Sequence, residues 1–203
     1  MGESERGPSG PLRSSKSGEH VTRLYTGKGD DGTTGLLFGG RVPKDSAHPR
    51  ACGAVDEAQA VIGVARSLCE RGSELDEALT LACRDLWVLM AELATLPENH
   101  DKLVDGQTRV SAEMVVAIEA LVDDLGERFE APSQFVVPGQ TPLAAQLDVA
   151  RTVVRRAERE AVQATVPGSH VLPYLNRLSS LLWVQARWVE DEHLLSRDVR
   201  KAP

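Results

Sequence analysis

The sequence predicts an all-α fold, a five-helix bundle with a glycine-rich loop ahead of its first helix. Apolar residues recur at three- and four-residue intervals through most of the chain after residue 47, which is the spacing of one helix face. Segments that contain glycine or proline, such as 71–73 and 96–99, separate these stretches. Strand-like residues occur only around 23–25 and 134–137, too few for a sheet core. Long helices with short connections pack as a bundle.

The elements follow one another along a single predicted domain. Residues 1–20 are rich in glycine, serine and charge and lack an apolar run, so they predict a disordered tail and not a signal peptide. The folded domain is predicted at 21–194 and a short C-terminal tail at 195–203. Within the domain, helices are predicted at 48–71, 75–96, 110–127, 142–166 and 172–194.

The fourth helix is the most informative because it carries four arginines. Its apolar stripe comprises Leu143, Leu147, Ala150, Val154, Ala157 and Ala161. Thr141 is suited to the N-cap, and Pro142 to the first helical position. On this register Arg156 points about 100° away from the other three arginines.

Those three, Arg151, Arg155 and Arg159, follow one another at single-turn spacing on one side of the helix. Guanidinium groups this close together need negative charge nearby. One interpretation is a solvated face on which Asp148 and Glu158 neutralise the arginines. The other is a clamp for a polyphosphate, because a guanidinium binds phosphate oxygens through two parallel hydrogen bonds and always keeps its charge.

Residues 25–35, YTGKGDDGTTG, combine four glycines with Lys28 and three threonines. Such a loop lets backbone N–H groups converge on an anion without side chains in the way. Its spacing does not match the Walker A motif. A mobile turn is the alternative, so the loop indicates phosphate binding chiefly in combination with the arginine helix.

Composition limits the classes of protein to consider. With 203 residues, 41% hydrophobic content and no long apolar run, we expect one soluble domain. The net charge of −7 and pI near 5.3 argue against general nucleic-acid binding. Cys52, Cys69 and Cys83 lack CxxC spacing and suit reduced thiols in the cytoplasm.

The usual catalytic motifs are missing from the sequence. The five histidines form no HExxH pair, which makes a protein zinc site unlikely, and there is no Gly-x-Ser-x-Gly elbow. A kinase would need a base and carboxylates for Mg²⁺, which the sequence does not suggest. The remaining groups bind a nucleotide but cannot attack it, so the nucleophile would be a second substrate that the protein positions.

Six motifs, in this order, resemble the PduO-type ATP:cob(I)alamin adenosyltransferases, a family of corrinoid adenosyltransferases. They are YTGKGDDGTTG at 25–35, GGRVPKD at 39–45, GAVDE at 53–57, FVVPG at 135–139, ARTVVRRAER at 150–159 and YLNRLS at 174–179. The resemblance runs from about residue 22 to 190. It implies a five-helix bundle that forms a homotrimer in the cytoplasm, with ATP and the corrinoid bound between subunits.

The activity implied by the resemblance is transfer of the 5′-deoxyadenosyl group of ATP to cobalt of cob(I)alamin, or of a precursor such as cobyrinic acid a,c-diamide, with release of triphosphate. Mg²⁺ would arrive with the ATP phosphates. A flavoprotein reductant and an adenosylcobalamin-dependent enzyme would be partners. The alternative is a protein that binds and delivers adenosylcobalamin with little activity, which an intact phosphate clamp disfavours.

The resemblance also implies roles for individual residues. Contacts to the nucleotide would come from Thr26, Gly27, Lys28, Thr33, Thr34, Lys44, Arg155, Glu158 and Asn176. Asp56 would pair with Arg151 and keep the clamp in register. Phe135 would cover the lower face of the corrin and exclude the axial base. Asp56 and Arg151 would come from one subunit, and residues 22–44 from its neighbour.

Several of these positions also have a purely structural interpretation. An aromatic such as Phe135 at the head of an apolar run is usually core, and Asp56 favours a helix N-terminus for dipole reasons. Trp183 and Trp188 suit packing or a subunit contact. One face of the last helix, a candidate interface, carries Asn176, Ser180, Trp183 and Arg187.

Four positions depart from the family pattern. Members usually carry histidine, aspartate, asparagine and a second glycine where this chain has Asp148, Ser180, Gln59 and Gln140. Asp148 stands one turn before Arg151, where we expect it either to compete with Asp56 for that arginine or to weaken the local positive potential.

Overall fold

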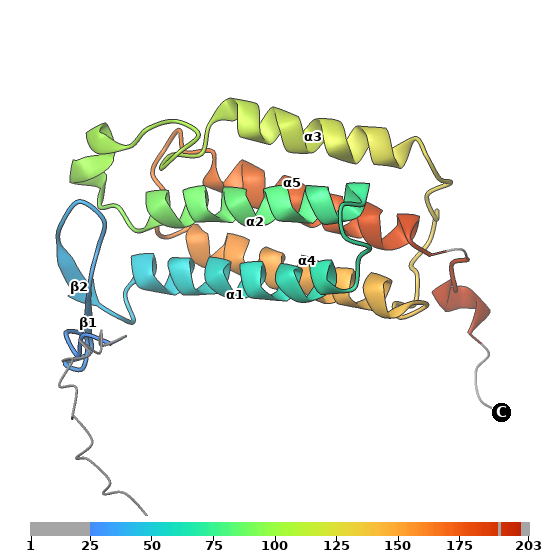
Figure 1. The fold of residues 1–203 in the computed structure, drawn as a ribbon, viewed down its shortest axis with the longest axis horizontal. Helices are drawn as coiled ribbons and strands as arrows, with labels where there is room; N and C mark the ends of the chain where they lie inside the picture. Colours follow the sequence, from blue (N-terminus) through green and yellow to red (C-terminus); the bar gives the residue numbers. More distant parts are fainter. Residues whose placement is uncertain (1–24, 191, 200–203) are drawn as a thin grey trace, which may run out of the picture.

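A computed structural model of the protein describes residues 25–190 and 192–199. The fold consists of five long helices, which confirms the predicted helical bundle (Figure 1). The helices are α1 (Ala47–Ser67), α2 (Glu74–Leu93), α3 (Ala112–Gly126), α4 (Pro142–Ala161) and α5 (Val171–Trp188). The short elements are strands β1 (Thr33–Gly35) and β2 (Arg41–Pro43) and the 3₁₀ turns η1 (Pro97–Lys102) and η2 (Ser196–Asp198).

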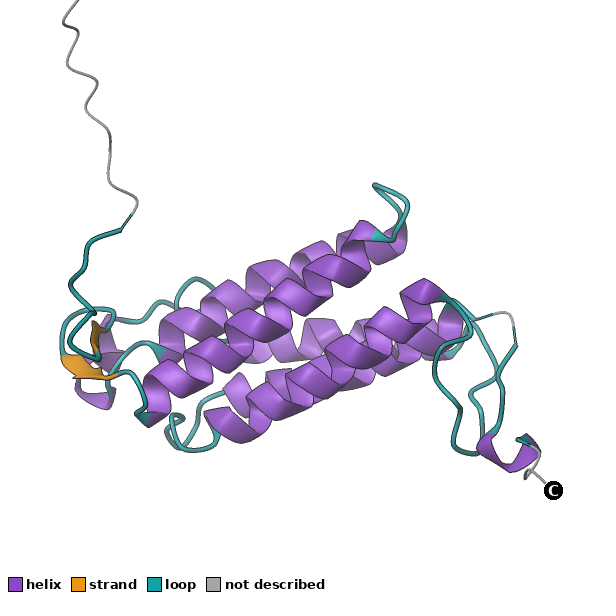
Figure 2. Ribbon diagram, turned by 90° about the horizontal axis from the view of Figure 1, so that it is seen from below, coloured by secondary structure: helices purple, strands orange, loops and turns teal. Residues whose placement is uncertain are grey.

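The helices pack side by side with their long axes nearly aligned (Figures 1 and 2). Helix α1 packs against α2 and α4, α5 packs against α4, and α3 covers α5 from outside. Apolar side chains from all five helices form one continuous core. None of the helices in the described part of the chain is long and apolar enough to cross a membrane.

Helix α4 follows the predicted register. The residues of its stripe from Leu147 to Ala161 are fully buried, and Leu143 is partly buried. The Thr141 hydroxyl accepts a hydrogen bond from the Ala144 N–H at 3.0 Å, and Pro142 occupies the first helical position. This cap satisfies one of the free N–H groups of the first turn. The predicted start of the helix is therefore confirmed.

The predicted ends of four helices were wrong. Helices α1, α2, α4 and α5 stop at Ser67, Leu93, Ala161 and Trp188, three to six residues before the predicted ends. In α2 the Thr95 hydroxyl bonds back to the Ala91 carbonyl at 2.8 Å, and Pro97 follows. Helix α3 starts at Ala112, two residues after the predicted start, and the Val110 N–H ahead of it donates to the Glu92 carboxylate at 2.7 Å.

The glycine-rich region holds a hairpin that was not predicted. Strands β1 and β2 pair antiparallel, with Thr33 opposite Pro43. The Leu37 N–H donates to the Ala94 carbonyl at 2.8 Å and ties the hairpin to the end of α2. At the hairpin tip Phe38 has a φ of 60°, which is unusual for a residue with a side chain.

Of the two strand-like segments predicted from the sequence, neither becomes a regular strand in the described chain. Residues 23 and 24 lie outside the described residues, and Tyr25 is irregular. In the second segment only Val136 forms a bridge, with Leu195. The expectation that strands are too few for a sheet core is confirmed within the described residues.

The structure describes part of the predicted C-terminal tail but none of the predicted N-terminal tail. The tail predicted at 1–20 lies outside the described residues. At the other end, the Val137 N–H donates to the Leu194 carbonyl at 2.8 Å, and the Ser196 N–H donates to the Phe135 carbonyl at 2.9 Å. The first residues assigned to the C-terminal tail thus lie against the segment that precedes α4. The domain boundaries themselves stay a prediction.

Two segments that the sequence singled out lie at opposite ends of the bundle (Figure 1). The hairpin and its glycines lie beside the start of α1, whereas residues 127–141 connect α3 to α4 at the far end. Helix α4 runs from this far end towards the hairpin end, and its 20 residues make it about 30 Å long.

Candidate active site

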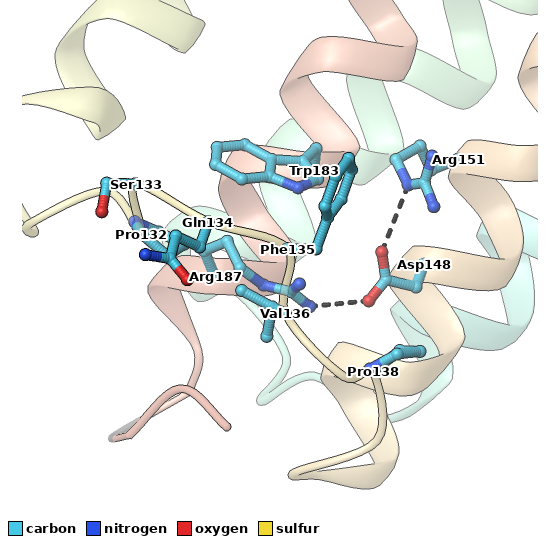
Figure 3. A pocket seen from close by; sticks show the side chains of 10 residues that line it. All are labelled: Pro132, Ser133, Gln134, Phe135, Val136, Pro138, Asp148, Arg151, Trp183 and Arg187. Carbon is cyan, nitrogen blue, oxygen red and sulfur yellow. Dashed lines mark hydrogen bonds and ion pairs between the residues drawn. The ribbon is translucent and has the colours of Figure 1, made fainter. Parts of the chain in front are cut away.

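A cleft lies where the segment before α4 crosses α4 and α5 (Figure 3). Its volume is about 450 Å³. We call it the Phe135 cleft, and its lining consists of Pro132, Ser133, Gln134, Phe135, Val136, Pro138, Asp148, Arg151, Trp183 and Arg187. One wall is apolar and the other carries charged groups from α4 and α5, so the cleft suits a large ligand with both apolar and polar parts.

Phe135 is not a core residue, because 87% of its side chain is exposed. The interpretation of this aromatic as plain core is therefore wrong. Backbone hydrogen bonds to Ser196 and Leu194 hold the chain in place at Phe135 itself and at Val137, two residues later. An exposed aromatic on a segment fixed in this way is available to pack against a flat apolar ligand.

A second cleft adjoins the first on the same side of α4 and α5. This Arg155 cleft has a volume of about 240 Å³ and is lined by Arg151, Arg155, Ser179, Ser180, Trp183 and Val184. Arg151 and Trp183 line both clefts. Two ligands bound in the two clefts would therefore meet beside these residues.

The arginines of α4 differ in their partners. Arg151 is paired with Asp148, and Arg156 with Glu57 of α1. In the described part of the chain no carboxylate lies within 4 Å of the Arg155 guanidinium. The interpretation as a neutralised helix face, which concerned Arg151, Arg155 and Arg159, thus holds for Arg151 alone, because neither of the other two has a carboxylate within 4 Å in the described residues and Arg155 lines an open cleft.

Two other predicted nucleotide contacts lie together. The Asn176 amide donates to the Glu158 carboxylate at 3.1 Å, which joins α5 to α4. Arg177 donates to the Asn176 side-chain oxygen at 2.8 Å and to Glu119 of α3 at 2.7 Å. Glu158 therefore hydrogen-bonds an amide and does not neutralise an arginine. Arg177 belongs to the YLNRLS motif, but the sequence gave no reason to single it out.

The predicted pair of Asp56 and Arg151 does not form within the chain. The Arg151 Nε lies 3.2 Å from Asp148 Oδ1, whereas Asp56 is exposed to solvent on α1. Asp148 is three residues before Arg151 on the same helix, so it reaches the guanidinium without help from another element. The prediction of a buried intrachain pair was wrong.

The glycine-rich loop is built around Asp31. The Thr33 N–H and hydroxyl donate to the Asp31 carboxylate at 2.9 and 2.7 Å, and these bonds are the main reason that the pKa of Asp31 is lowered. Arg41 pairs with the same carboxylate at 3.2 Å and donates to the Lys28 carbonyl. The Thr33 hydroxyl is therefore already occupied in this structure.

Lysine charge nevertheless lies over the loop. A Cβ on Gly29 would come within 3.0 Å of Lys44 Nζ and 3.1 Å of the Thr33 carbonyl, so only glycine lets the ammonium approach this closely. Gly27 and Gly32 have φ values of 66° and 79°, in the left-handed region that favours glycine. The structure thus brings Lys44 to the loop, while its predicted contact with the nucleotide stays a prediction.

The predicted site residues fall into two groups in one chain. Phe135, Arg151, Arg155, Glu158 and Asn176 lie along α4 and α5 and beside them. The members of the loop group are Thr26, Gly27, Lys28, Thr33, Thr34 and Lys44. No hydrogen bond or ion pair joins the described part of the loop, residues 25–44, to α4.

Sequence reasoning underrated three residues of the Phe135 cleft. Trp183 was assigned to packing or a subunit contact, Arg187 to a candidate interface, and Asp148 to a neutralised helix face and a departure from the family. The available signal was the face of α5 that carries Asn176, Ser180, Trp183 and Arg187, because each of these side chains lines a cleft or bonds to a residue beside one. The described residues contain no group of three or more His, Cys, Asp or Glu side chains that could hold a metal ion.

Comparisons with known proteins agree with this geometry. The cobalamin adenosyltransferase family matches residues 24–189. A corrinoid adenosyltransferase of Mycobacterium tuberculosis is 43% identical over 176 residues, which cover 83% of this chain and 89% of that protein. One similar solved structure is a variant PduO-type ATP:corrinoid adenosyltransferase from Lactobacillus reuteri complexed with cobalamin and ATP. It has a TM-score of 0.77 and 29% identity, and the match covers 87% of this chain and 97% of that one. The chain belongs to the cobalamin adenosyltransferase family.

Proposed function

We propose that the protein transfers the 5′-deoxyadenosyl group of ATP to the cobalt of reduced cob(I)alamin or of a corrinoid precursor. The observation that carries this proposal is the pair of adjoining clefts, which share Arg151 and Trp183. One offers an exposed aromatic and the other an unpaired guanidinium. A corrinoid in the Phe135 cleft and ATP in the Arg155 cleft would place the cobalt and the 5′ carbon of ATP near the two shared residues.

In this reaction the cobalt electron pair forms a bond to the 5′ carbon of ATP. The bond from that carbon to the triphosphate oxygen breaks, and triphosphate leaves with its electrons. The protein supplies no nucleophile. Its part is to hold both substrates and to stabilise charge that grows on the leaving group. Arg155 is suited to this part because it has no acidic partner within 4 Å in the described residues.

Phe135 would act on the corrin. Its ring stands in the cleft and is almost fully exposed, so it can cover one face of a bound macrocycle and keep an axial ligand from the cobalt. Loss of the axial ligand makes cobalt four-coordinate and easier to reduce. Glu158 and Asn176, joined by their hydrogen bond, would hold the nucleoside end of ATP.

The glycine-rich loop would bind phosphates of ATP in a neighbouring subunit. In one chain the loop and the Phe135 segment lie at opposite ends of the bundle, which supports a site shared between subunits (Figure 1). Lys28 and Lys44 would contribute positive charge, with Thr26, Gly27, Thr33 and Thr34 as further contacts. For its hydroxyl to reach phosphate, Thr33 has to release Asp31. The number of subunits, three, follows from the family resemblance.

Other parts of the proposal rest on the chemistry of the substrates. Mg²⁺ would be held by ATP phosphates and water. An electron donor such as a flavoprotein would supply cob(I)alamin, and an adenosylcobalamin-dependent enzyme would take the product. We place the protein in the cytoplasm. Its cysteines, Cys52, Cys69 and Cys83, form no disulfide.

The test is anaerobic incubation of the protein with Mg-ATP and chemically reduced cobalamin, followed by visible spectra. We expect adenosylcobalamin to form in many turnovers, with one triphosphate released for each corrin. A delivery protein would bind added adenosylcobalamin but make none. That outcome would contradict the proposed enzyme and support the alternative.

A further inference from the structure

A row of charged side chains runs from the boundary of the two clefts into the interior. Arg151 Nε lies 3.2 Å from Asp148 Oδ1, and Asp148 Oδ2 lies 2.6 Å from an Nη of Arg187 (Figure 3). Arg187 Nε lies 3.0 Å from Glu190, whose Oε2 lies 3.1 Å from His193 Nδ1. From Arg151 to Glu190 positive and negative groups alternate, so each of these four charges has an opposite neighbour.

The inner members of this row are buried. Arg187 is 2% exposed and Asp148 is 8% exposed. Both carboxylate oxygens of Asp148 are in use, one for each arginine. A buried carboxylate with two fixed partners cannot turn without leaving a charge unpaired. Asp148 therefore has one orientation, which Arg187 determines.

Arg151 differs from Arg187 because its side chain is 31% exposed and lines both clefts. A long side chain in such a place loses conformational freedom when it is held. Asp148 binds only its Nε–H. The four terminal N–H groups of Arg151 thus stay available for an anion or a corrin amide in the adjoining clefts.

We propose that Arg187, acting through Asp148, is a positioning residue that fixes the Arg151 guanidinium at the boundary between the nucleotide and corrin clefts. This inference rests on the proposed function, in which Arg151 faces both substrates. In this role Arg187 does not itself contact the cobalt or the 5′ carbon of ATP. Its effect passes through the one carboxylate that it shares with Arg151.

The competing explanation is that the row only stabilises the fold. The two explanations differ in a double-mutant cycle. If Asp148 acts through Arg151, then Asp148→Asn should lower kcat/KM for ATP about tenfold in the otherwise wild-type enzyme, since small displacements of binding groups cost up to about 10²-fold. In an Arg151→Ala enzyme the same change should cost less than twofold. An equal cost in both backgrounds would overturn the proposal.

Arg187→Lys is the matched variant for the inner position. It keeps the charge but loses the guanidinium geometry. We therefore expect kcat/KM for ATP to lie between the values of wild type and Arg187→Gln. As before, we expect this difference only in enzymes that retain Arg151. Thermal midpoints of all variants show which of them fold as well as wild type. Should Arg187→Gln not fold, Asp148→Asn still decides the question, because Asn has the shape of Asp and accepts a hydrogen bond.

A second readout does not depend on activity. In ¹H–¹⁵N spectra of arginine side chains, the Nε–H resonance of Arg151 is identified by its absence from Arg151→Lys. We expect it to exchange slowly with water in wild type and quickly in Asp148→Asn and Arg187→Lys. Unchanged exchange would contradict the positioning role. A wild-type protein that makes no adenosylcobalamin would instead contradict the proposed function, and the resonance would then decide the positioning role alone.

Discussion

Arg155 and Arg156 are neighbours on α4, yet of the two only Arg156 has an acidic partner among the residues that the structure describes. Its guanidinium pairs with Glu57 of α1, whereas that of Arg155 lines the Arg155 cleft. The helix turns by about 100° from one residue to the next, so adjacent arginines face different surroundings. This pair offers a matched comparison of an arginine that we assign to catalysis with one that holds two helices together.

We expect Arg155→Ala to lower the adenosylation rate by about 10²–10³-fold, because a charged donor is lost where negative charge grows on triphosphate. Arg156→Ala should keep the rate within about threefold, since a surface ion pair contributes about 0–1 kcal/mol. Rates are followed by the visible spectrum of the cobalamin. Activity of Arg155→Ala within threefold of wild type would exclude Arg155 from the site.

Phe135→Ala should leave ATP affinity and folding unchanged and slow turnover from cob(II)alamin under reducing conditions. The ring is exposed, so its removal should change the free energy of unfolding by only about 0.5 kcal/mol or less. Trp87→Ala removes another exposed aromatic, which lines neither cleft, and serves as the control. Calorimetric titration with an unreactive ATP analogue measures affinity. A variant that loses ATP binding would show that Phe135 does not act on the corrin alone.

Subunit mixing tests the shared site. Lys28→Ala and Arg155→Ala proteins should each be inactive alone, because each lacks one half of every phosphate site. After denaturation and joint refolding, mixed assemblies should recover activity, since some sites then join an intact loop to an intact Arg155. A site within one chain could not be rebuilt in this way. Light scattering verifies assembly, and exchanged mixtures without activity would contradict the shared site.

Asp85 provides a pH-dependent test of stability. It is buried and accepts a hydrogen bond from the Tyr174 hydroxyl at 3.0 Å. Burial raises the pKa of its carboxyl above the ordinary value of 3.8, although the Tyr174 bond opposes the rise. The folded state therefore keeps the proton to a higher pH than the unfolded state does. The Asp85 contribution to stability falls as pH rises from about 3.8 through the folded-state pKa.

Asp85→Asn removes this titration and keeps an oxygen for Tyr174. We expect the variant to be more stable than wild type at pH 7, with a smaller decline in the unfolding free energy above pH 4. Urea unfolding across this pH range measures the difference. If the variant were less stable at pH 7, the carboxylate would instead be stabilised by Arg84, whose Nη1 lies 3.8 Å away.

The helices could be predicted because the regularly spaced apolar residues are the ones that are buried in the core. The α4 stripe and its Thr141 cap are local features, and both are present in the structure. Helix ends depend on distant partners, and the sequence does not show them. The start of α3 is an example, since the Val110 N–H is bound by Glu92, a residue 18 positions away.

Motifs identified more of the site than spacing did. Arg155 lines the Arg155 cleft, and Glu158 and Asn176 are joined by a hydrogen bond between α4 and α5, while their contacts with a nucleotide stay a prediction. The Asp56–Arg151 pair was wrong because this chain has an acid at position 148, and a partner three residues away on the same helix takes precedence. The sequence placed Arg187 on a candidate interface face of the last helix, but its ion pair with Asp148 could not be predicted, because that pair depends on how α4 and α5 pack.

The C-terminal segment has a practical bearing on how the protein is handled. The Leu194 carbonyl accepts a hydrogen bond from the Val137 N–H, and the Ser196 N–H donates to the carbonyl of Phe135, the most exposed aromatic of the Phe135 cleft. A protease cut before residue 194 would release this tether while leaving all five helices whole. Such a clipped preparation would still look helical by circular dichroism, so an intact mass has to accompany any measured activity.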